Sequence, residues 1–250
     1  MQLVELRDGT LVSAIGQGTW SMAEDRSRRS DEIAALREGI ELGMTVIDTA
    51  EKYAGGAVEE LVADAIEGRR DRVFLVSKVL PENASRERLP LACHGSLRRL
   101  GTDRLDLYLL HWRGGVPLEE TVEALEELKR EGKILRWGVS NFDTGDMEEL
   151  TSFSGHRCAT NQILYNLSRR GPELGVLPWL AEHRMPVMAY SPVEQGRLLK
   201  NAALESVAQS LGSSPAQVAL AWLLRRPSLI AVPKTAAKGI KTAQGSTRRW

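Results

Sequence analysis

The sequence has little that would support a disulfide framework, a metal centre or a strongly charged partner. Its two cysteines, Cys93 and Cys158, lie far apart and belong to no Cys/His spacing typical of a zinc site. Lys and Arg together number 33, as do Asp and Glu, so no net field favours nucleic acid or an anionic membrane. No apolar run approaches a membrane span, and the first residues lack a signal-peptide core. We therefore expect a cytoplasmic protein with buried thiols and no metal, membrane or nucleic-acid partner.

The sequence also lacks the usual signatures of covalent hydrolases and of open-sheet dinucleotide folds. No GxSxG motif is present, and neither cysteine ends an apolar run beside a histidine. Residues 16–18, GQG, are only a fragment of the dinucleotide fingerprint and open no helix, which argues against a Rossmann fold. Among the histidines, only His111 ends an apolar run. Surface or capping roles suit the other three, His94, His156 and His183.

An alternation of short apolar runs with longer helical segments fills most of the chain. At the start, Arg7-Asp8-Gly9 between two apolar runs predicts a β-hairpin. After it, most runs begin roughly thirty residues apart, the length of one βαβ repeat, and eight such units close a barrel rather than an open sheet. We expect one α/β domain, a (β/α)8 TIM barrel, over residues 1–235. The eight runs are residues 13–20, 44–50, 73–79, 105–112, 134–142, 158–165, 186–192 and 229–235.

Helical periodicity fills the gaps between these runs. Residues 58–66 carry apolar side chains at i, i+3, i+4, i+7 and i+8, with Gly68 placed to end a helix. Residues 204–211 repeat this stripe. Residues 214–217, SPAQ, combine an N-cap serine, a proline at the first helical position and a capping-box glutamine, which predicts a helix through Trp222. The last gap is longer than the others, so we expect it to hold an extra short helix.

Polar side chains lie in the C-terminal halves of seven successive runs. In a barrel of parallel strands these ends meet at one mouth, the face that carries the active site in barrel enzymes. Asp48 and Lys78 also fit a purely structural interpretation as a buried ion pair. Seven converging positions favour a catalytic pocket, because an isolated buried charge is costly. The residues are Asp48, Lys78, His111, Ser140, Asn141, Gln162, Tyr190, Ser191 and Lys234.

Eight motifs at these positions resemble those of the aldo-keto reductases in order and spacing. The resemblance covers residue 3 to about Thr235. It implies an oxidoreductase that reduces aldehydes and ketones to alcohols by hydride transfer from NADP(H), with NAD(H) as the alternative, and that acts on a small carbonyl substrate. The motifs are GTW (18–20), DTAEKY (48–53), VSKV (76–79), LYLLHW (107–112), WGVSNF (137–142), NQILYN (161–166), AYSP (189–192) and VPKT (232–235).

The resemblance makes Asp48, Tyr53, Lys78 and His111 the catalytic residues, with Tyr53 as general acid. A free phenol has a pKa near 10, and a nearby ammonium favours the phenolate. Lys78, held charged by Asp48, is therefore expected to tune Tyr53. During reduction, Tyr53 and His111 would donate hydrogen bonds to the oxygen on which negative charge develops. The implied substrate contacts are Trp20, Tyr53, His111 and Trp112.

The resemblance also implies a cofactor site along the same strand ends. Ser140, Asn141 and Gln162 would hold the carboxamide, and Tyr190 would stack on the nicotinamide ring. The segment from Ser191 onward would contact the pyrophosphate. The full set of implied contacts is Thr19, Trp20, Asp48, Ser140, Asn141, Gln162, Tyr190, Ser191, Pro192, Val193, Gln195 and, near the adenosine ribose, Lys234 and Thr235.

Two places depart from the family pattern. Ala54 stands where glycine commonly follows the tyrosine, and Gly55 and Gly56 are expected to supply the turn freedom instead. Residues 236–250 show no apolar stripe where the family has an eighth barrel helix that grips the adenosine end of the cofactor. We expect that helix to be missing or irregular, leaving an atypical tail over residues 236–250. Such a tail predicts weak cofactor binding and a reduced preference for NADPH over NADH.

Two other functions stay open from the sequence. One is a cofactor-binding sensor or regulatory barrel with little turnover, and the other is an inactive, C-terminally truncated reductase. The intact set of four catalytic residues favours the enzyme. No exposed heptad or long apolar face is evident, which predicts a monomer.

Overall fold

The computed structural model describes residues 1–234, and the chain opens with the expected hairpin. Strands β1 (Leu3–Glu5) and β2 (Leu11–Ser13) pair antiparallel, with Val4 opposite Val12. Gly9 takes φ +84° in the turn, a conformation that glycine adopts without a steric penalty. The Arg7 guanidinium donates to backbone oxygens of residues that precede two barrel strands, including those of His156 and His183. The hairpin is therefore fastened to the N-terminal end of the barrel.

Eight parallel strands form the barrel, in the order β3 to β10 around the sheet. Each strand pairs with its sequence neighbour, as right-handed βαβ units require. The first and last strands meet through a parallel bridge between Ile15 and Ala231, which confirms the predicted barrel. The strands are β3 (Gln17–Gly18), β4 (Val46–Asp48), β5 (Phe74–Val79), β6 (Leu107–Leu110), β7 (Trp137–Ser140), β8 (Asn161–Leu164), β9 (Val187–Tyr190) and β10 (Leu229–Val232).

Close backbone approach on both sides of the first barrel strand explains two glycines. A Cβ on Gly16 would lie 2.8 Å from the Val46 carbonyl oxygen, and one on Gly18 would lie 2.8 Å from that of Val232. Both contacts are too short for a side chain at either position. The GQG fragment, which is not a dinucleotide fingerprint, thus lets the first barrel strand pack closely between β4 and β10.

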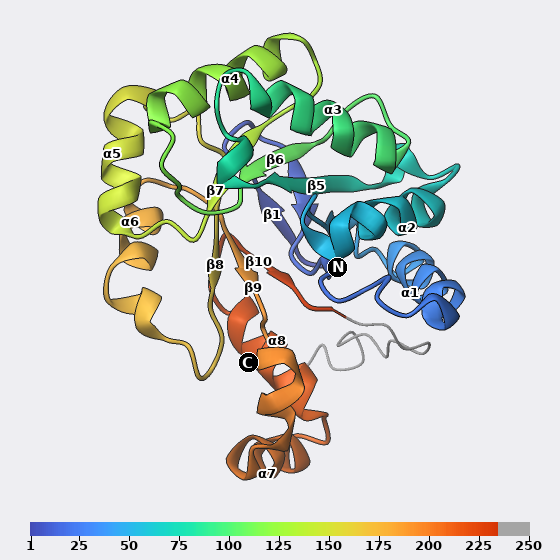
Figure 1. Cartoon of the computed structure of the whole chain (residues 1–250). Coiled ribbons are helices and arrows are strands. Elements are labelled where there is room, and N and C mark those ends of the chain that lie inside the picture. The colour runs from blue at the N-terminus through green and yellow to red at the C-terminus, as the bar shows by residue number, and fades with distance from the viewer. Residues whose placement is uncertain (235–250) are drawn as a thin grey trace.

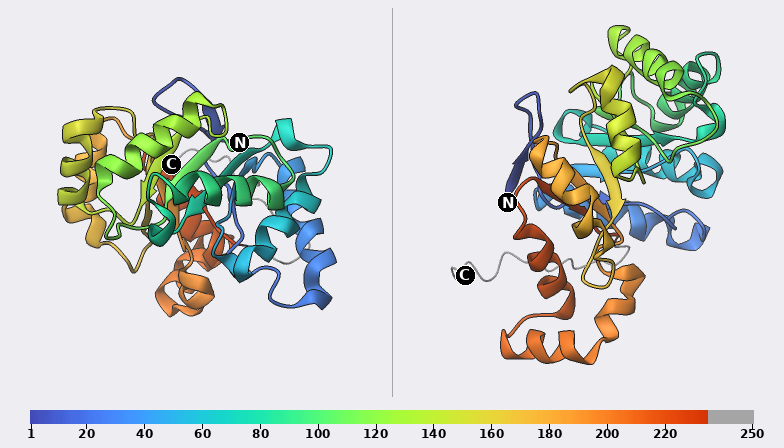
Figure 2. Two further views of the ribbon diagram at one scale, coloured as in Figure 1. Left: turned by 45° about the horizontal axis from the view of Figure 1, so that its top comes forward. Right: turned by 90° about the vertical axis from the view of Figure 1, so that its left-hand side faces the viewer.

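Helices fill the connections, and each predicted helix is present (Figure 1). Ser214 and Gln217 form the predicted reciprocal capping box at the start of α8. Helices α7 and α8 both follow β9, α7 being the extra short helix, and α7 lies farthest from the barrel (Figure 2). The α-helices are α1 (Arg29–Glu41), α2 (Ala57–Ile66), α3 (Arg88–Leu100), α4 (Leu118–Arg130), α5 (Thr144–Ser154), α6 (Val176–Glu182), α7 (Ala202–Ser210) and α8 (Pro215–Leu224). The 3-10 helices are η1 (Arg26–Arg28), η2 (Tyr53–Gly56), η3 (Arg70–Arg72), η4 (Pro81–Asn83), η5 (Gly171–Leu174) and η6 (Glu194–Lys200).

The apolar core has two main parts. The larger part lies between the strands and the surrounding helices and includes both cysteines, which are buried and unpaired as expected. The smaller part fills the barrel interior, where Val46, Val76 and Leu109 pack with Val4 and Val12 of the hairpin. The hairpin thus closes one end of the barrel, which leaves the other end open for a site.

Two predictions lie outside the residues that the structure describes. The first is the missing or irregular eighth barrel helix, with an atypical tail over residues 236–250. The second is the cofactor contact assigned to Thr235. Within residues 1–234, no helix is long and apolar enough to cross a membrane.

Candidate active site

A cavity of about 660 Å³ opens at the C-terminal ends of the barrel strands. This volume lies in the usual range for small-molecule and cofactor sites. Every described residue that the sequence assigned to the site lines this cavity, except Lys78, which lies behind Tyr53. The assigned lining residues are Thr19, Trp20, Asp48, Tyr53, His111, Trp112, Ser140, Asn141, Gln162, Tyr190, Ser191, Pro192, Val193, Gln195 and Lys234.

A buried ion pair stands directly behind Tyr53. Lys78 Nζ lies 2.8 Å from Asp48 Oδ1, and the two side chains are 1% and 5% exposed. The same ammonium donates to the Tyr53 hydroxyl oxygen at 3.3 Å and to the Thr49 carbonyl oxygen at 2.9 Å. The amide nitrogen of Gln162 donates to Asp48 Oδ1 at 2.8 Å. The carboxylate therefore holds the ammonium, and the ammonium in turn holds the phenol.

The turn that presents Tyr53 consists of three successive residues in the left-handed region. Ala54, Gly55 and Gly56 have φ of 46°, 62° and 97°. The two glycines supply turn freedom as expected, but Ala54 itself is also left-handed. A side chain in this conformation costs about 1–2 kcal/mol, and such strain is typical of functional loops. The departure at Ala54 therefore leaves the position of Tyr53 intact at a small energetic cost.

Burial decides the direction of the Tyr53 pKa. Burial raises this pKa above 10.0, the Lys78 ammonium lowers it and Asp48 raises it, so the net direction is upward. The expected effect of Lys78 is present but is outweighed, and Tyr53 is a protonated phenol at neutral pH. Burial lowers the pKa of Lys78, but Asp48 and Tyr53 raise it above 10.5 in sum. The lysine thus stays charged beside a phenol that keeps its proton.

His111 faces Tyr53 across the mouth as a neutral imidazole. The two rings are 5.9 Å apart in an edge-to-face arrangement. Burial, followed by the ammonium groups of Lys78 and Lys52, lowers the pKa of His111 to about 3. Its Nδ1 atom is buried without a hydrogen-bond partner among residues 1–234. A neutral ring of this kind can share a hydrogen bond with an oxygen atom without bringing a charge into the cavity.

This low pKa predicts how His111 responds to acid. The unfolded chain takes up a proton on this residue near pH 6.5, whereas the folded chain does so only near pH 3. The contribution of His111 to stability should therefore shrink as the pH falls from 6.5 towards 3. We expect the ring-nitrogen NMR shifts of His111 to stay constant from pH 8 to pH 5. We also expect His111→Gln to lose less stability than the unmodified protein between pH 8 and pH 5. A His111 titration near pH 6.5 would contradict both expectations.

Amides and hydroxyls form the next part of the wall. Asn141 donates from its amide to the His111 carbonyl oxygen at 3.0 Å and accepts from the Tyr190 hydroxyl at 2.8 Å. Ser140 donates to the backbone oxygen of Gln162 at 2.9 Å. The Gln162 amide nitrogen is already engaged with Asp48, so only its side-chain oxygen lacks a hydrogen-bond partner among the described residues. An acceptor in that place suits the N–H donors of a carboxamide.

The segment after β9 is held in an uncommon backbone conformation. Ser191, Glu194 and Gln195 have φ of 51°, 49° and 56°, although none is glycine. Asn166 and Arg169 donate to the Glu194 carboxylate at 2.6 and 3.0 Å. Left-handed non-glycine residues are over-represented at ligand-binding loops, where the surrounding structure offsets their strain. Here Asn166 and Arg169 supply that support, and the segment lines the cavity.

The comparison with known families agrees with this geometry. The model of the aldo/keto reductase family matches residues 14–243. This chain belongs to the aldo/keto reductase family. The eight motifs and the barrel therefore identify the family correctly, and the chain is an oxidoreductase.

Similar proteins from several bacteria share the barrel of this aldo/keto reductase. Methylglyoxal reductase YeaE of Escherichia coli is 53% identical over 241 residues, which cover 94% of this chain and 85% of that protein. Glyoxal reductase of Bacillus subtilis is 33% identical over 93% of this chain and 82% of its own length. The crystal structure of an aldo-keto reductase from Klebsiella pneumoniae in complex with NADPH superposes with a TM-score of 0.92 at 52% identity, covering 94% and 85% of the two chains.

Two tryptophans and a lysine complete the wall of the reductase cavity. Trp112 lies against His111 with ring centroids 4.7 Å apart, and Trp20 is 50% exposed at the rim. The Lys52 ammonium lies 4.7 Å above the Trp112 ring. Lys52 was not predicted, although it adjoins Tyr53 in the DTAEKY motif. The other lining residues that sequence reasoning missed are Gly18, Ser21, Gly196, Leu199 and Val232.

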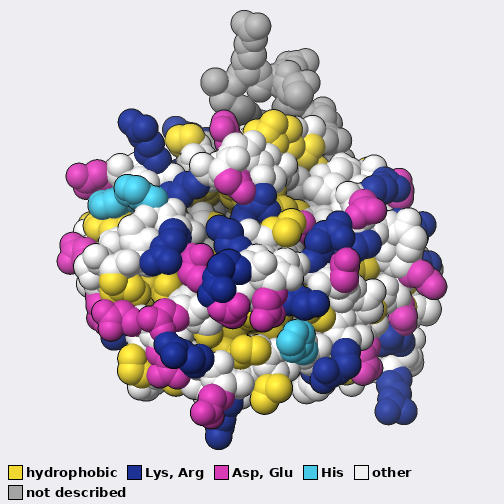
Figure 3. All heavy atoms as spheres, turned by 90° about the horizontal axis from the view of Figure 1, so that it is seen from above, with side chains coloured by type: hydrophobic (Ala, Val, Ile, Leu, Met, Phe, Trp, Pro, Cys, Tyr) yellow, Lys and Arg dark blue, Asp and Glu magenta, His cyan; other side chains and the backbone are white. Residues whose placement is uncertain are grey.

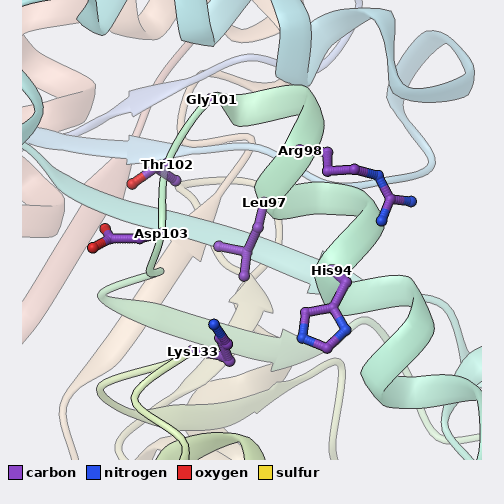
Figure 4. Close-up of a pocket in the computed structure, with 7 residues that line it drawn as sticks. All are labelled: His94, Leu97, Arg98, Gly101, Thr102, Asp103 and Lys133. Atoms are coloured by element: carbon purple, nitrogen blue, oxygen red, sulfur yellow. The ribbon is translucent and has the colours of Figure 1, made fainter.

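A second hollow lies at the opposite end of the strands, where Asp103 precedes β6 and Lys133 precedes β7. Its volume is about 530 Å³. His94 and Lys133 flank Leu97, whereas Arg98 and Asp103 point away from them (Figure 4). The positive side chains thus do not converge on one point. This end of a barrel usually serves stability rather than catalysis, so the candidate active site is the cavity around Tyr53.

Proposed function

We propose that this chain reduces small aldehydes and ketones to alcohols with NADP(H), and that Tyr53 is the proton donor. One observation carries the proposal: the Tyr53 hydroxyl, backed by the Lys78–Asp48 ion pair, lies at the mouth of a cavity beside a neutral His111. Reduced nicotinamide, when bound, supplies a hydride to the carbonyl carbon. The protein must then stabilise and protonate the oxygen.

Tyr53 and His111 meet this requirement from two sides of the mouth. As negative charge develops on the carbonyl oxygen, the Tyr53 phenol donates a hydrogen bond and then its proton. Lys78 stabilises the resulting phenolate, because its ammonium lies 3.3 Å from that oxygen. The neutral imidazole of His111 donates a second hydrogen bond from the other side. Asp48 keeps Lys78 charged throughout, so the proton comes from Tyr53 rather than from Lys78.

The cavity wall fits the cofactor that this reaction needs. The side-chain oxygen of Gln162 offers an acceptor for a carboxamide, and Ser140 and Asn141, held by their own hydrogen bonds, line the cavity beside it. Tyr190 presents a half-buried ring, and the segment from Ser191 lines the same cavity. The similarity to a reductase crystallised with NADPH supports NADP(H) as the cofactor.

Turnover separates an active reductase from a sensor barrel or an inactive product. We expect the purified protein to oxidise NADPH with methylglyoxal and with a simple aromatic aldehyde, and to release the corresponding alcohols. Methylglyoxal is chosen because the similar E. coli protein is a methylglyoxal reductase. NADPH binding without alcohol formation would instead support the sensor.

Cofactor selectivity depends on the segment in which the sequence leaves the family pattern. Residues 236–250 contain lysines but no apolar stripe, and a lysine ammonium lacks the bidentate geometry that arginine offers to a phosphate. We therefore predict weak binding and only a small preference for NADPH over NADH. A fluorescence titration with both cofactors measures the preference. Tight and strongly NADPH-selective binding would show that another segment supplies the phosphate site.

We propose a single barrel domain over residues 1–235 and a cytoplasmic monomer. Acidic and basic side chains are interspersed on the face that carries α3 and α4, and apolar groups there are small (Figure 3). Light scattering at low protein concentration should return a mass near 27.6 kDa. A dimer mass would overturn the monomer. The strongly exposed leucines are Leu3 and Leu11 on the paired strands of the hairpin, Leu91 on α3 and Leu174 in η5.

A further inference from the structure

Lys52 brings a positive charge to the substrate side of the cavity. It directly precedes Tyr53, it is exposed, and it lines the cavity mouth. Its ammonium lies 4.7 Å from the centre of the Trp112 ring. Such a cation–π contact holds the flexible lysine over the wall without neutralising its charge.

This charge has no carboxylate partner in the part of the chain that the structure describes. No Asp or Glu oxygen among residues 1–234 lies within 4.0 Å of Lys52. Arg113, only one residue beyond Trp112, is by contrast paired with Asp146 and with Glu149.

The cavity itself offers Lys52 no carboxylate. Of its described lining residues, only Asp48 is acidic, and that carboxylate already binds Lys78 and Gln162. Lys234, the other lining lysine, donates to the Ser21 carbonyl oxygen. Among the described lining residues, Lys52 is therefore the one lysine whose ammonium has neither a carboxylate nor a carbonyl partner.

The position of Lys52 suggests which part of a substrate it meets. Tyr53 and His111 form the pair that receives the carbonyl oxygen, and Trp112 adjoins His111 with ring centroids 4.7 Å apart. Lys52 lies over Trp112 and is thus separated from the carbonyl site by one aromatic ring. A flat or short spacer along the indole would connect a carbonyl group to an anionic group at Lys52.

We infer that Lys52 binds the carboxylate of the substrate, so that carbonyl compounds bearing a carboxylate are preferred over their neutral counterparts. The inference rests on the proposed function and assigns a substrate class to the same site. An ammonium is a compact charge that attracts carboxylates without demanding bidentate geometry. Because Lys52 is exposed, its contribution should be moderate and should weaken in salt.

A matched pair of aldehydes tests this assignment. The full-length protein is assayed with 4-carboxybenzaldehyde and with methyl 4-formylbenzoate, its neutral ester, at saturating NADPH. We expect Lys52→Met to lower the acid-to-ester ratio of kcat/KM by about tenfold, mainly through the KM of the acid. Lys52→Arg should keep most of the ratio, and added KCl should lower the ratio of the unmodified protein towards that of Lys52→Met.

The control is Lys129→Met, which removes an equal charge from an exposed position on α4. It should leave the ratio unchanged. If the ester is reduced but the ratio is the same with and without Lys52, the assignment of Lys52 is wrong and the proposed function stands. If the unmodified protein reduces neither aldehyde, the proposed function fails and this inference fails with it.

Discussion

Replacing Tyr53 with phenylalanine should lower kcat by about a hundredfold to ten-thousandfold, the usual cost of losing a positioned general acid. The variant keeps the aromatic ring that lies edge-on to His111, and it leaves the Lys78–Asp48 ion pair in place. Only the hydroxyl that would give its proton to the alkoxide is lost. NADPH binding, measured by fluorescence, should therefore change little, whereas single-turnover reduction should slow by the full factor.

Tyr108→Phe is a suitable control for this experiment. The Tyr108 side chain is fully buried and does not line the cavity, so loss of its hydroxyl should leave kcat unaltered. A deuterated hydride donor shows whether hydride transfer limits the rate in each protein. If Tyr53→Phe retains near-normal turnover while that isotope effect is expressed, another group is the proton donor.

The positions of the site residues that end barrel strands could be predicted because they depend on topology. Asp48, His111 and Gln162 each end or follow an apolar run, and parallel strands bring such ends to one mouth. The family motifs then added Tyr53, which lies beyond a strand on a short turn. The Asp48–Lys78 pair was also expected, but the net effect of burial on Tyr53, the hydrogen bond of Gln162 and the direction of Lys52 were not.

Those omitted properties explain what the sequence could not predict. The pKa of Tyr53 is raised because burial outweighs the nearby ammonium, and burial is a property of the folded barrel. The Gln162 amide donates a hydrogen bond to Asp48 because β4 and β8, which are far apart in the chain, face each other across the barrel. Lys52 resembles any solvated lysine in sequence, and only the turn before Tyr53 directs it over Trp112.

The hairpin and the barrel seam also show which features depend on neighbouring residues and which depend on the folded barrel. Asp8-Gly9 fixes the turn locally, so the hairpin could be predicted from neighbouring residues. The first barrel strand was expected over residues 13–20, but Ser13 belongs to β2 and regular pairing in β3 is confined to Gln17–Gly18. The backbone still follows the last strand, since Gly16 and Gly18 donate to the backbone oxygens of Ala231 and Pro233. Glycine is required at both positions because the backbones of β4 and β10 approach too closely for side chains.

Lys78→Met should damage both activity and stability, unlike the change at Tyr53. Methionine fills a similar volume but removes the ammonium 2.8 Å from Asp48, and this carboxylate is 5% exposed. Removing one partner of a buried ion pair typically costs about 3–5 kcal/mol, because the other charge stays buried and unpaired. The remaining Gln162 amide donates one hydrogen bond and cannot replace a full charge. Turnover should fall about as far as in Tyr53→Phe, because the phenolate formed during reduction loses its stabilising cation.

A double variant separates the two effects of Lys78. Adding Asp48→Asn to Lys78→Met removes the stranded carboxylate, so urea unfolding should show much of the lost stability restored. Turnover should stay low, since the cation beside Tyr53 is still absent. If the single variant unfolds like the unmodified protein, Asp48 does not depend on Lys78 for its charge compensation. If the double variant regains both stability and turnover, the ion pair is structural and the Tyr53 phenol needs no ammonium behind it.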